Sequence, residues 1–293
     1  MTGRGKVILL GEHAVVYGHP ALAGAIGLGV TATASPSTAD RLEIPAWEPE
    51  APWAMQPNHP IRLALAAVKD ALGIKTPFAI VANATVPPRA GLGSSAALAV
   101  ALVRALAQAT DRALDDDAVE KAALAAERVF HGTPSGIDVA LATRGGLGLF
   151  RRGEGLTRID APPVRLAVGI SPEPRDTAAR VAAVAARLAA EPQTTRARLE
   201  RLGELALAGR ALVQLGPLFE EAQSILAALG VSSPGIERLC ALARDAGARG
   251  VKLTGAGGGG AVIALPGSDG EEPILAAWSS AGFAARAVDV GIT

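Results

Sequence analysis

The sequence predicts an α+β protein with two domains, and three observations support this prediction. Its 293 residues exceed what one domain of roughly 100–200 residues needs. Strand and helix patterns alternate over the first half, whereas residues 176–246 have helical periodicity throughout. The chain then ends as strand, loop, strand, helix and strand. We place the domain boundary near residues 160–165, at "IDAPPVR", and expect domains over residues 1–162 and 163–293.

In the first domain, short apolar or alternating runs predict strands, and apolar residues at helical spacing predict helices. Gly73 and Gly132 are typical helix stops, and the last of these helices has an acidic start at Asp115. The expected strands are residues 6–10, 29–35, 77–86 and 146–150, and the expected helices are residues 59–73, 94–110 and 115–132.

In the second domain, a strand over residues 165–171 precedes a long helical region rich in Ala, Leu, Arg and Glu. Proline and glycine break its periodicity, and Gly247 is a plausible final stop. The breaks lie at Pro192, Gly216 with Pro217, Gly230 and Pro234; strands follow over residues 250–255, 261–265 and 284–290, with a helix near residues 271–281.

Composition excludes several classes of function. Lys plus Arg and Asp plus Glu both number 28, which argues against a nucleic-acid groove or a polybasic membrane surface. Cys240 is the only cysteine, so we expect a small buried side chain and a reducing, cytoplasmic location. No uncharged apolar window is long enough for a membrane span, and the run over residues 7–10 is too short for a signal peptide.

The stretch "PPRAGLGSSAALAV" (residues 87–100) has mostly small side chains at the point where a helix is expected to begin. Backbone N–H groups at a helix N-terminus bind anions, and small residues let a phosphate approach them. The alternative is a plain helix cap made by Ser94 or Ser95. The stretch also fits the bare dinucleotide pattern, with Asp111 twenty residues beyond Gly91. A dinucleotide site needs a strand that runs directly into the first glycine and a second strand that ends at the acidic residue. Here residues 87–90 separate the strand from Gly91, and no strand precedes Asp111.

Two acidic residues flank a turn. Glu127 lies near the end of a predicted helix, and Asp138 follows the turn over residues 132–136. A chain reversal there could bring both carboxylates beside a phosphate site, where they would hold Mg²⁺ and act as base or orienting group. The alternative is a surface carboxylate and a helix cap, with His131 favouring the C-terminal helix dipole.

Two further segments contain chemistry-bearing or unusual residues. Lys6 begins a buried strand, and Glu12 and His13 follow it; a cation there could stabilise transferred charge, although a solvated lysine and a surface pair are the alternative. Residues 255–260 contain five glycines, which predicts a loop whose backbone is approached closely by a ligand or by another segment of the chain. The alternative for these glycines is a loose hairpin loop.

Four segments in order resemble the signatures of the galactokinase, homoserine kinase, mevalonate kinase and phosphomevalonate kinase superfamily. They are "GKVILLGEHAVVYG", "PPRAGLGSSAAL", "HGTPSGID" and "KLTGAGGGG", spread over residues 5 to about 265. The first and third are most similar to mevalonate kinases, and galactokinases continue differently after the Glu-His pair. Residues 171–184 also resemble the mevalonate kinase segment that opens the second domain. Thr133 departs from the Asn usual in the family.

The resemblance implies a two-domain small-molecule kinase fold, with an N-terminal ribosomal-protein-S5-like α/β domain and a C-terminal ferredoxin-like α+β domain. It implies ATP-dependent phosphorylation of the mevalonate 5-hydroxyl with Mg²⁺, in isoprenoid precursor synthesis, without nucleic-acid or membrane partners, and it leaves a homodimer open. Another small alcohol or phosphomevalonate as substrate, or a non-catalytic ligand-binding relative, are the alternatives.

The resemblance also implies roles for individual residues. Asp138 would face the substrate hydroxyl, and Lys6 would contact that hydroxyl or the γ-phosphate. Ser95 and Glu127 would hold the metal. Glu12, His13 and Ser135 would line the substrate pocket. The nucleotide would contact Pro88, Ala90, Gly91, Leu92, Gly93, Ser94, Ser95, Ala96, Gly255 and Gly257, with the loop over residues 255–260 closing over the phosphates.

Overall fold

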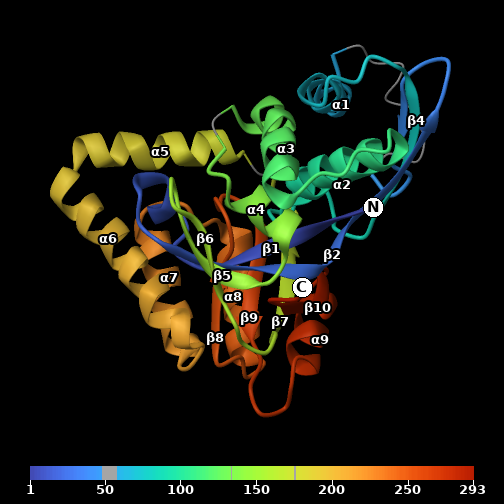
Figure 1. Cartoon of the computed structure of the whole chain (residues 1–293). Helices are drawn as coiled ribbons and strands as arrows, with labels where there is room; N and C mark the ends of the chain where they lie inside the picture. Colours follow the sequence, from blue (N-terminus) through green and yellow to red (C-terminus); the bar gives the residue numbers. More distant parts are fainter. Residues whose placement is uncertain (48–57, 133, 175) are drawn as a thin grey trace. The chain divides into compact units, whose positions relative to one another are not determined.

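The structure is a computed structural model that describes residues 1–47, 58–132, 134–174 and 176–293 (Figure 1). The chain forms two compact units, each described by itself below, and strands β1 and β2 contribute residues to both. The first unit holds Met1–Lys6, Gly27–Pro88 and Gly93–Gly145, and the second holds Val7–Ile26, Arg89–Leu92 and Gly146–Thr293. The domain limits 1–162 and 163–293 stay a prediction.

A small sheet forms one part of the first unit. Its strands are β1 (Thr2–Leu10), β2 (Ala21–Pro36), β3 (Arg41–Glu43) and β4 (Phe78–Ala84). The second half of β2 runs antiparallel to β4, and β3 runs parallel to β4. Side chains along β4 alternate, with Phe78, Ile80 and Ala82 buried, so one face of this sheet belongs to the core.

The other part of the first unit is helical. It consists of α1 (Pro60–Ala71), α2 (Ser94–Ala109), α3 (Asp116–His131) and α4 (Ile137–Arg144). Helix α2 packs against the other three, which explains why its Ala, Leu and Val residues are buried almost all round. Asp115 caps α3 through the N–H of Ala118, as its acidic start predicts.

The second unit has an antiparallel sheet with the strand order β10–β7–β9–β8. Its strands are β7 (Val164–Ser171), β8 (Gly250–Leu253), β9 (Gly260–Leu265) and β10 (Ala284–Val290). Helices α8 (Pro234–Asp245) and α9 (Glu272–Ser280) pack on these strands and against each other. This order of strands and helices is the ferredoxin-like arrangement.

Three more helices of this unit, α5 (Thr177–Ala190), α6 (Pro192–Ala208) and α7 (Leu215–Ala228), pack in succession (Figure 1). The expected break at Gly216 and Pro217 is confirmed to within a few residues, because α6 ends at Ala208 and α7 begins at Leu215. Both residues lie in the first turn of α7, where proline is tolerated. The unit is completed by η1 (Ala14–Tyr17), η3 (Gly209–Ala211) and the hairpin β5 (Leu147–Arg151) with β6 (Gly155–Ile159).

The predicted α+β class is confirmed by these elements. Cys240 is buried in α8, as expected of a small apolar side chain. Among the described residues, no helix combines the length and the apolar character that a membrane crossing needs.

Candidate active site

The loop before α2 has an unusual backbone. Arg89, Gly91 and Gly93 have φ angles of 58°, 86° and 75°, so every second residue is left-handed. Alternation of this kind turns successive N–H groups toward a common concavity that suits anions. Gly93 is the N-cap of α2, so within the described chain no side chain caps this helix. The alternative expectation that Ser94 or Ser95 caps it is therefore wrong.

Lys6 reaches Gly93 at the start of α2, because the first residues of β1 lie very close to this helix. A Cβ on Gly3 would lie 2.1 Å from the carbonyl oxygen of Ala97, so only glycine fits there. Lys6 lies farther along β1, and a Cβ on Gly93 would lie 3.0 Å from its Cγ. Lys6 is buried, and its Nζ lies 3.3 Å from Oδ1 of Asp138. The alternative of a solvated lysine is wrong.

The turn between α3 and α4 brings the two predicted carboxylates into one cluster. Glu127 is buried on α3, so the surface alternative is wrong. Asp138 lies in the first turn of α4, whose N-cap is Gly136 with a φ of 92°, so Asp138 is not the cap. Ser135 is half-buried in this turn, whereas Thr133 lies outside the described residues.

Glu127 has the most perturbed environment of the cluster. Burial raises the pKa of its carboxyl to about 7, and the charge of Asp138 adds to this rise. The Ser95 hydroxyl and the Lys6 ammonium act in the opposite direction. Among the described residues, no hydrogen-bond donor reaches the buried Oε1 of Glu127. A buried carboxylate oxygen without a partner is costly, and a cation held there would offset that cost.

These residues fit a Mg²⁺ ion. Mg²⁺ prefers oxygen ligands and is usually held by one or two carboxylates together with substrate phosphates. The Glu127 carboxylate and the Ser95 hydroxyl are oxygen donors of this kind, beside a helix N-terminus that suits phosphate. In the described part of the chain, no cluster of three or more His, Cys, Asp and Glu residues could form a cage made by protein alone.

His131 also belongs to the cluster, which its expected role at a helix end did not predict. It is the last residue of α3, and its Nε2 lies 3.2 Å from Oγ of Ser95. The same nitrogen lies 3.9 Å from Oε2 of Glu127. The imidazole is therefore placed to orient the Ser95 hydroxyl, one of the two groups that would hold the metal.

In the second unit, Glu12 and His13 are buried, so the alternative of a surface pair is wrong. Glu12 accepts a hydrogen bond from Nζ of Lys252 on β8. Nε2 of His13 donates to the carbonyl oxygen of Ala256 at 2.9 Å, and burial lowers the pKa of this imidazole. The sequence interpretation missed Lys252, although a lysine inside an apolar strand is itself a signal.

The loop over residues 255–260 is buried throughout, and its five glycines all have positive φ angles between 73° and 136°. A Cβ on Gly257 would lie 2.1 Å from the carbonyl oxygen of Val231. Another on Gly259 would lie 2.5 Å from that of Glu173. The loop is closely packed, so the alternative of a loose hairpin is wrong.

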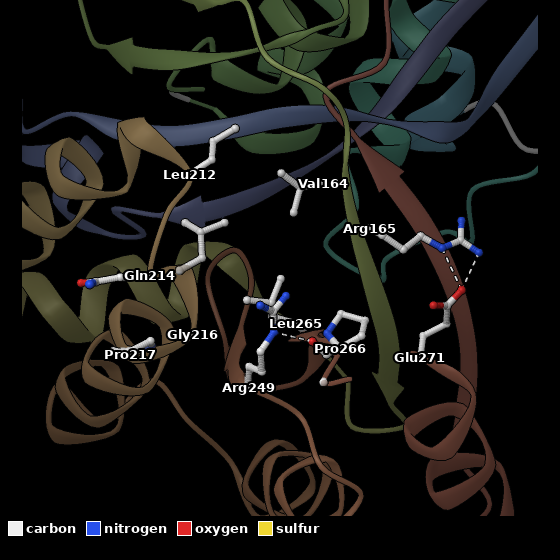
Figure 2. Close-up of a pocket in the computed structure, with 12 residues that line it drawn as sticks. Val164, Arg165, Leu212, Gln214, Gly216, Pro217, Arg249, Leu265, Pro266 and Glu271 are labelled. Atoms are coloured by element: carbon white, nitrogen blue, oxygen red, sulfur yellow. Dashed lines mark hydrogen bonds and ion pairs between the residues drawn. The ribbon is translucent and has the colours of Figure 1, made fainter. Parts of the chain in front are cut away.

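Figure 2 shows a different pocket in the second unit, of about 390 Å³. None of the predicted site residues lines it. Its arginines already have protein partners: Arg165 pairs with Glu271 at 2.7 Å, and Nε of Arg249 donates to the carbonyl oxygen of Pro266 at 2.7 Å. We assign it no function.

Comparisons with known proteins show the family of the chain. Residues 58–146 match the GHMP kinases N terminal domain, and residues 190–284 match the GHMP kinases C terminal domain. The chain is 32% identical to the mevalonate kinase of Pyrococcus abyssi, with 91% of this chain and 88% of the relative covered. It is 36% identical to that of Aeropyrum pernix, with 89% and 86% covered.

The fold is similar to that of the L. major mevalonate kinase solved in complex with R-mevalonate, with a TM-score of 0.88 and 27% identity. That match covers 100% of this chain and 95% of the other. The chain belongs to the GHMP kinases. Within them it belongs to the mevalonate kinase family, as the identity and coverage of its relatives show.

Proposed function

We propose that this chain transfers the γ-phosphoryl group of ATP to the 5-hydroxyl of mevalonate, giving 5-phosphomevalonate and ADP for isoprenoid precursor synthesis. Family membership supports the reaction, and the similar L. major kinase was solved with R-mevalonate bound. The observation that carries the proposal is the buried Glu127 carboxylate beside the Lys6–Asp138 pair. The single cysteine supports a cytoplasmic location, and a homodimer stays a prediction.

The triphosphate binds at the N-terminus of α2. The left-handed residues of its loop direct N–H groups to one side, and the positive end of the helix dipole adds to the attraction. The proposed contacts in the first unit are those of Pro88, Gly93, Ser94, Ser95 and Ala96. Ala90, Gly91, Leu92, Glu12, His13, Gly255 and Gly257 lie in the second unit, and their roles stay predictions.

Ser95 and Glu127 hold Mg²⁺, which neutralises phosphate charge when it is bound with ATP. Helix α2 positions the Ser95 backbone, and Glu127 is buried on α3. His131 contacts the Ser95 hydroxyl and holds its oxygen toward the same side as the Glu127 carboxylate.

Lys6 and Asp138 act on the reacting groups. Oδ1 of Asp138 accepts the proton of the substrate hydroxyl or orients it, and the ammonium of Lys6 stabilises negative charge that develops on the oxygens. The 3.3 Å ion pair between them fixes both side chains before substrate binds. Phosphoryl transfer has a loose transition state, so alignment and charge contribute more than activation of the nucleophile.

A coupled assay of ADP release tests this function directly. Mevalonate, galactose, homoserine and phosphomevalonate are each supplied with ATP, with and without Mg²⁺. We expect Mg²⁺-dependent ADP release with mevalonate and much slower release with the other three. Faster turnover of another alcohol would assign a different substrate, and mevalonate binding without any ADP release would mean a non-catalytic relative.

A further inference from the structure

Buried polar contacts join the end of β1 and its following turn to β8 and the glycine loop over residues 255–260. Oγ1 of Thr254 accepts a hydrogen bond from the Ile8 N–H at 2.9 Å and donates to the Ile8 carbonyl oxygen at 3.0 Å. His13 adds the bond from its Nε2 to the carbonyl oxygen of Ala256. The side chains of Thr254 and His13 are both buried, so water competes little for these bonds.

The ion pair between Glu12 and Lys252 lies at the centre of these contacts. Both side chains have 0% exposure, and Nζ of Lys252 also donates to the carbonyl oxygen of Leu253 at 2.6 Å. A buried ion pair is weak evidence for stability, because apolar residues of similar volume often serve as well or better. Stability alone is therefore a weak explanation for this pair.

The glycine loop needs such positioning. Five of its six residues are glycines, which lose more conformational entropy on ordering than any other residue. Ala256 is the exception, and its carbonyl is the group that His13 holds. His13 itself has a positive φ of 60°, which non-glycine residues rarely adopt, and its neighbour Glu12 bonds to Lys252.

We propose that Glu12, Lys252 and His13 are positioning residues that hold the glycine loop in the one conformation that accepts a nucleotide triphosphate. The ligand in this statement rests on the proposed function. The role differs from the direct substrate contact that family resemblance implies for Glu12 and His13, because it acts through the loop backbone.

The first test replaces both charges together, as Glu12→Leu with Lys252→Met, which fills the same space without an ion pair. We expect an unchanged or higher melting temperature, faster amide hydrogen exchange over residues 255–260, and about tenfold weaker binding of Mg²⁺ with a non-hydrolysable ATP analogue by calorimetry. Wild-type loop exchange and nucleotide affinity in the folded double variant would overturn the proposal.

A second pair of variants keeps the proposal testable if that protein does not fold. His13→Leu removes the donor to Ala256, whereas His13→Gln offers an N–H at similar reach. We expect the leucine variant to speed loop exchange and weaken nucleotide binding, the glutamine variant to restore both, and KM for mevalonate to stay unchanged. The control is His59→Asn. His59 caps α1 in the first unit, outside this network, and asparagine can also serve as a cap.

A rise in KM for mevalonate with unchanged loop exchange in His13→Leu would instead support direct substrate contact and overturn positioning. Loop exchange is measured without substrate, so it separates this proposal from the proposed function. If the wild type released no ADP with mevalonate but the variants loosened the loop, only the function would be wrong.

Discussion

The two units each contain a buried cluster of charged side chains, and the clusters differ in charge balance. In the second unit, one carboxylate, Glu12, meets one ammonium, Lys252. In the first unit, two carboxylates, Glu127 and Asp138, share the field of one ammonium, Lys6. A balanced pair is neutral as a whole, whereas an unbalanced cluster is suited to a charged ligand.

The strongest test of this contrast is loss of the reacting groups. Asp138→Asn and Lys6→Met should each lower kcat by the equivalent of about 2–4 kcal/mol, a range typical of one preorganised electrostatic group. Steady-state ADP release on folded protein measures the effect. Lys69→Met removes another buried lysine of the first unit, paired with Asp40 at 2.5 Å, and should leave kcat unchanged. Near-wild-type kcat in both site variants would contradict the assigned roles.

Glu127→Gln should separate activity from stability. We expect activity to fall at least about a hundredfold, because the metal loses its carboxylate ligand. Folding raises the pKa of Glu127 to about 7, so the native carboxyl binds a proton that the unfolded chain has released. The stability that Glu127 contributes is therefore present below its usual pKa and is lost as pH rises through 7.

Above pH 7 the ligand-free Glu127→Gln variant should accordingly be more stable than the wild type, by up to about 3 kcal/mol. The two proteins should be similar near pH 4. Urea unfolding at both pH values measures this difference, with Glu120→Gln on the same helix as the control. Equal stability of variant and wild type at pH 8 would show that the charge of Glu127 is already compensated.

Ser95→Ala should have a smaller effect, directed at the metal. We expect about tenfold more Mg²⁺ to be needed for half-maximal rate, since one neutral oxygen ligand is lost. Ser94→Ala should change KM for ATP and leave the Mg²⁺ requirement near that of the wild type. A chelator in excess should stop the reaction of all three proteins. Equal Mg²⁺ requirements for the two serine variants would remove Ser95 from the metal site.

The smallest expected effect concerns the loop before α2. Gly93→Ala places a methyl group 3.0 Å from Cγ of Lys6 at a left-handed φ of 75°. Gly73→Ala meets the same kind of backbone strain, at a φ of 63°, with nothing within 4 Å. Both should lose about 1 kcal/mol of stability, and only Gly93→Ala should lower kcat, by several-fold. A similar kcat in both variants would mean that Gly93 has no role in placing Lys6.

Long periodic segments could be predicted from the sequence, because apolar spacing and helix stops are local signals. Helices α2, α3 and α8 begin and end within one or two residues of the expected limits. Helix α4 and strand β3 were missed because each is too short to show a period. Strand β6 was missed because its sequence, GLTRI, is not an apolar run. Burial of these short segments depends on tertiary packing that no local pattern reports.

The candidate site could be named from motifs, but its local alternatives were wrong for a physical reason. Exposure of Lys6, Glu12 and Glu127 is decided by segments far away in the chain. The partner of Glu12, Lys252, lies 240 residues later, and no spacing rule connects them. His131 was placed correctly at the end of its helix. Its contact with Ser95 could not be predicted, because it depends on how α3 packs against the start of α2.

A crystal structure of the protein with Mg²⁺, a non-hydrolysable ATP analogue and mevalonate tests the central claim most directly. We predict the triphosphate at the N-terminus of α2, and the metal at about 2.0–2.1 Å from oxygens of both Glu127 and Ser95. A nucleotide bound elsewhere, or a metal that leaves the Glu127 carboxylate without a ligand, would contradict the account.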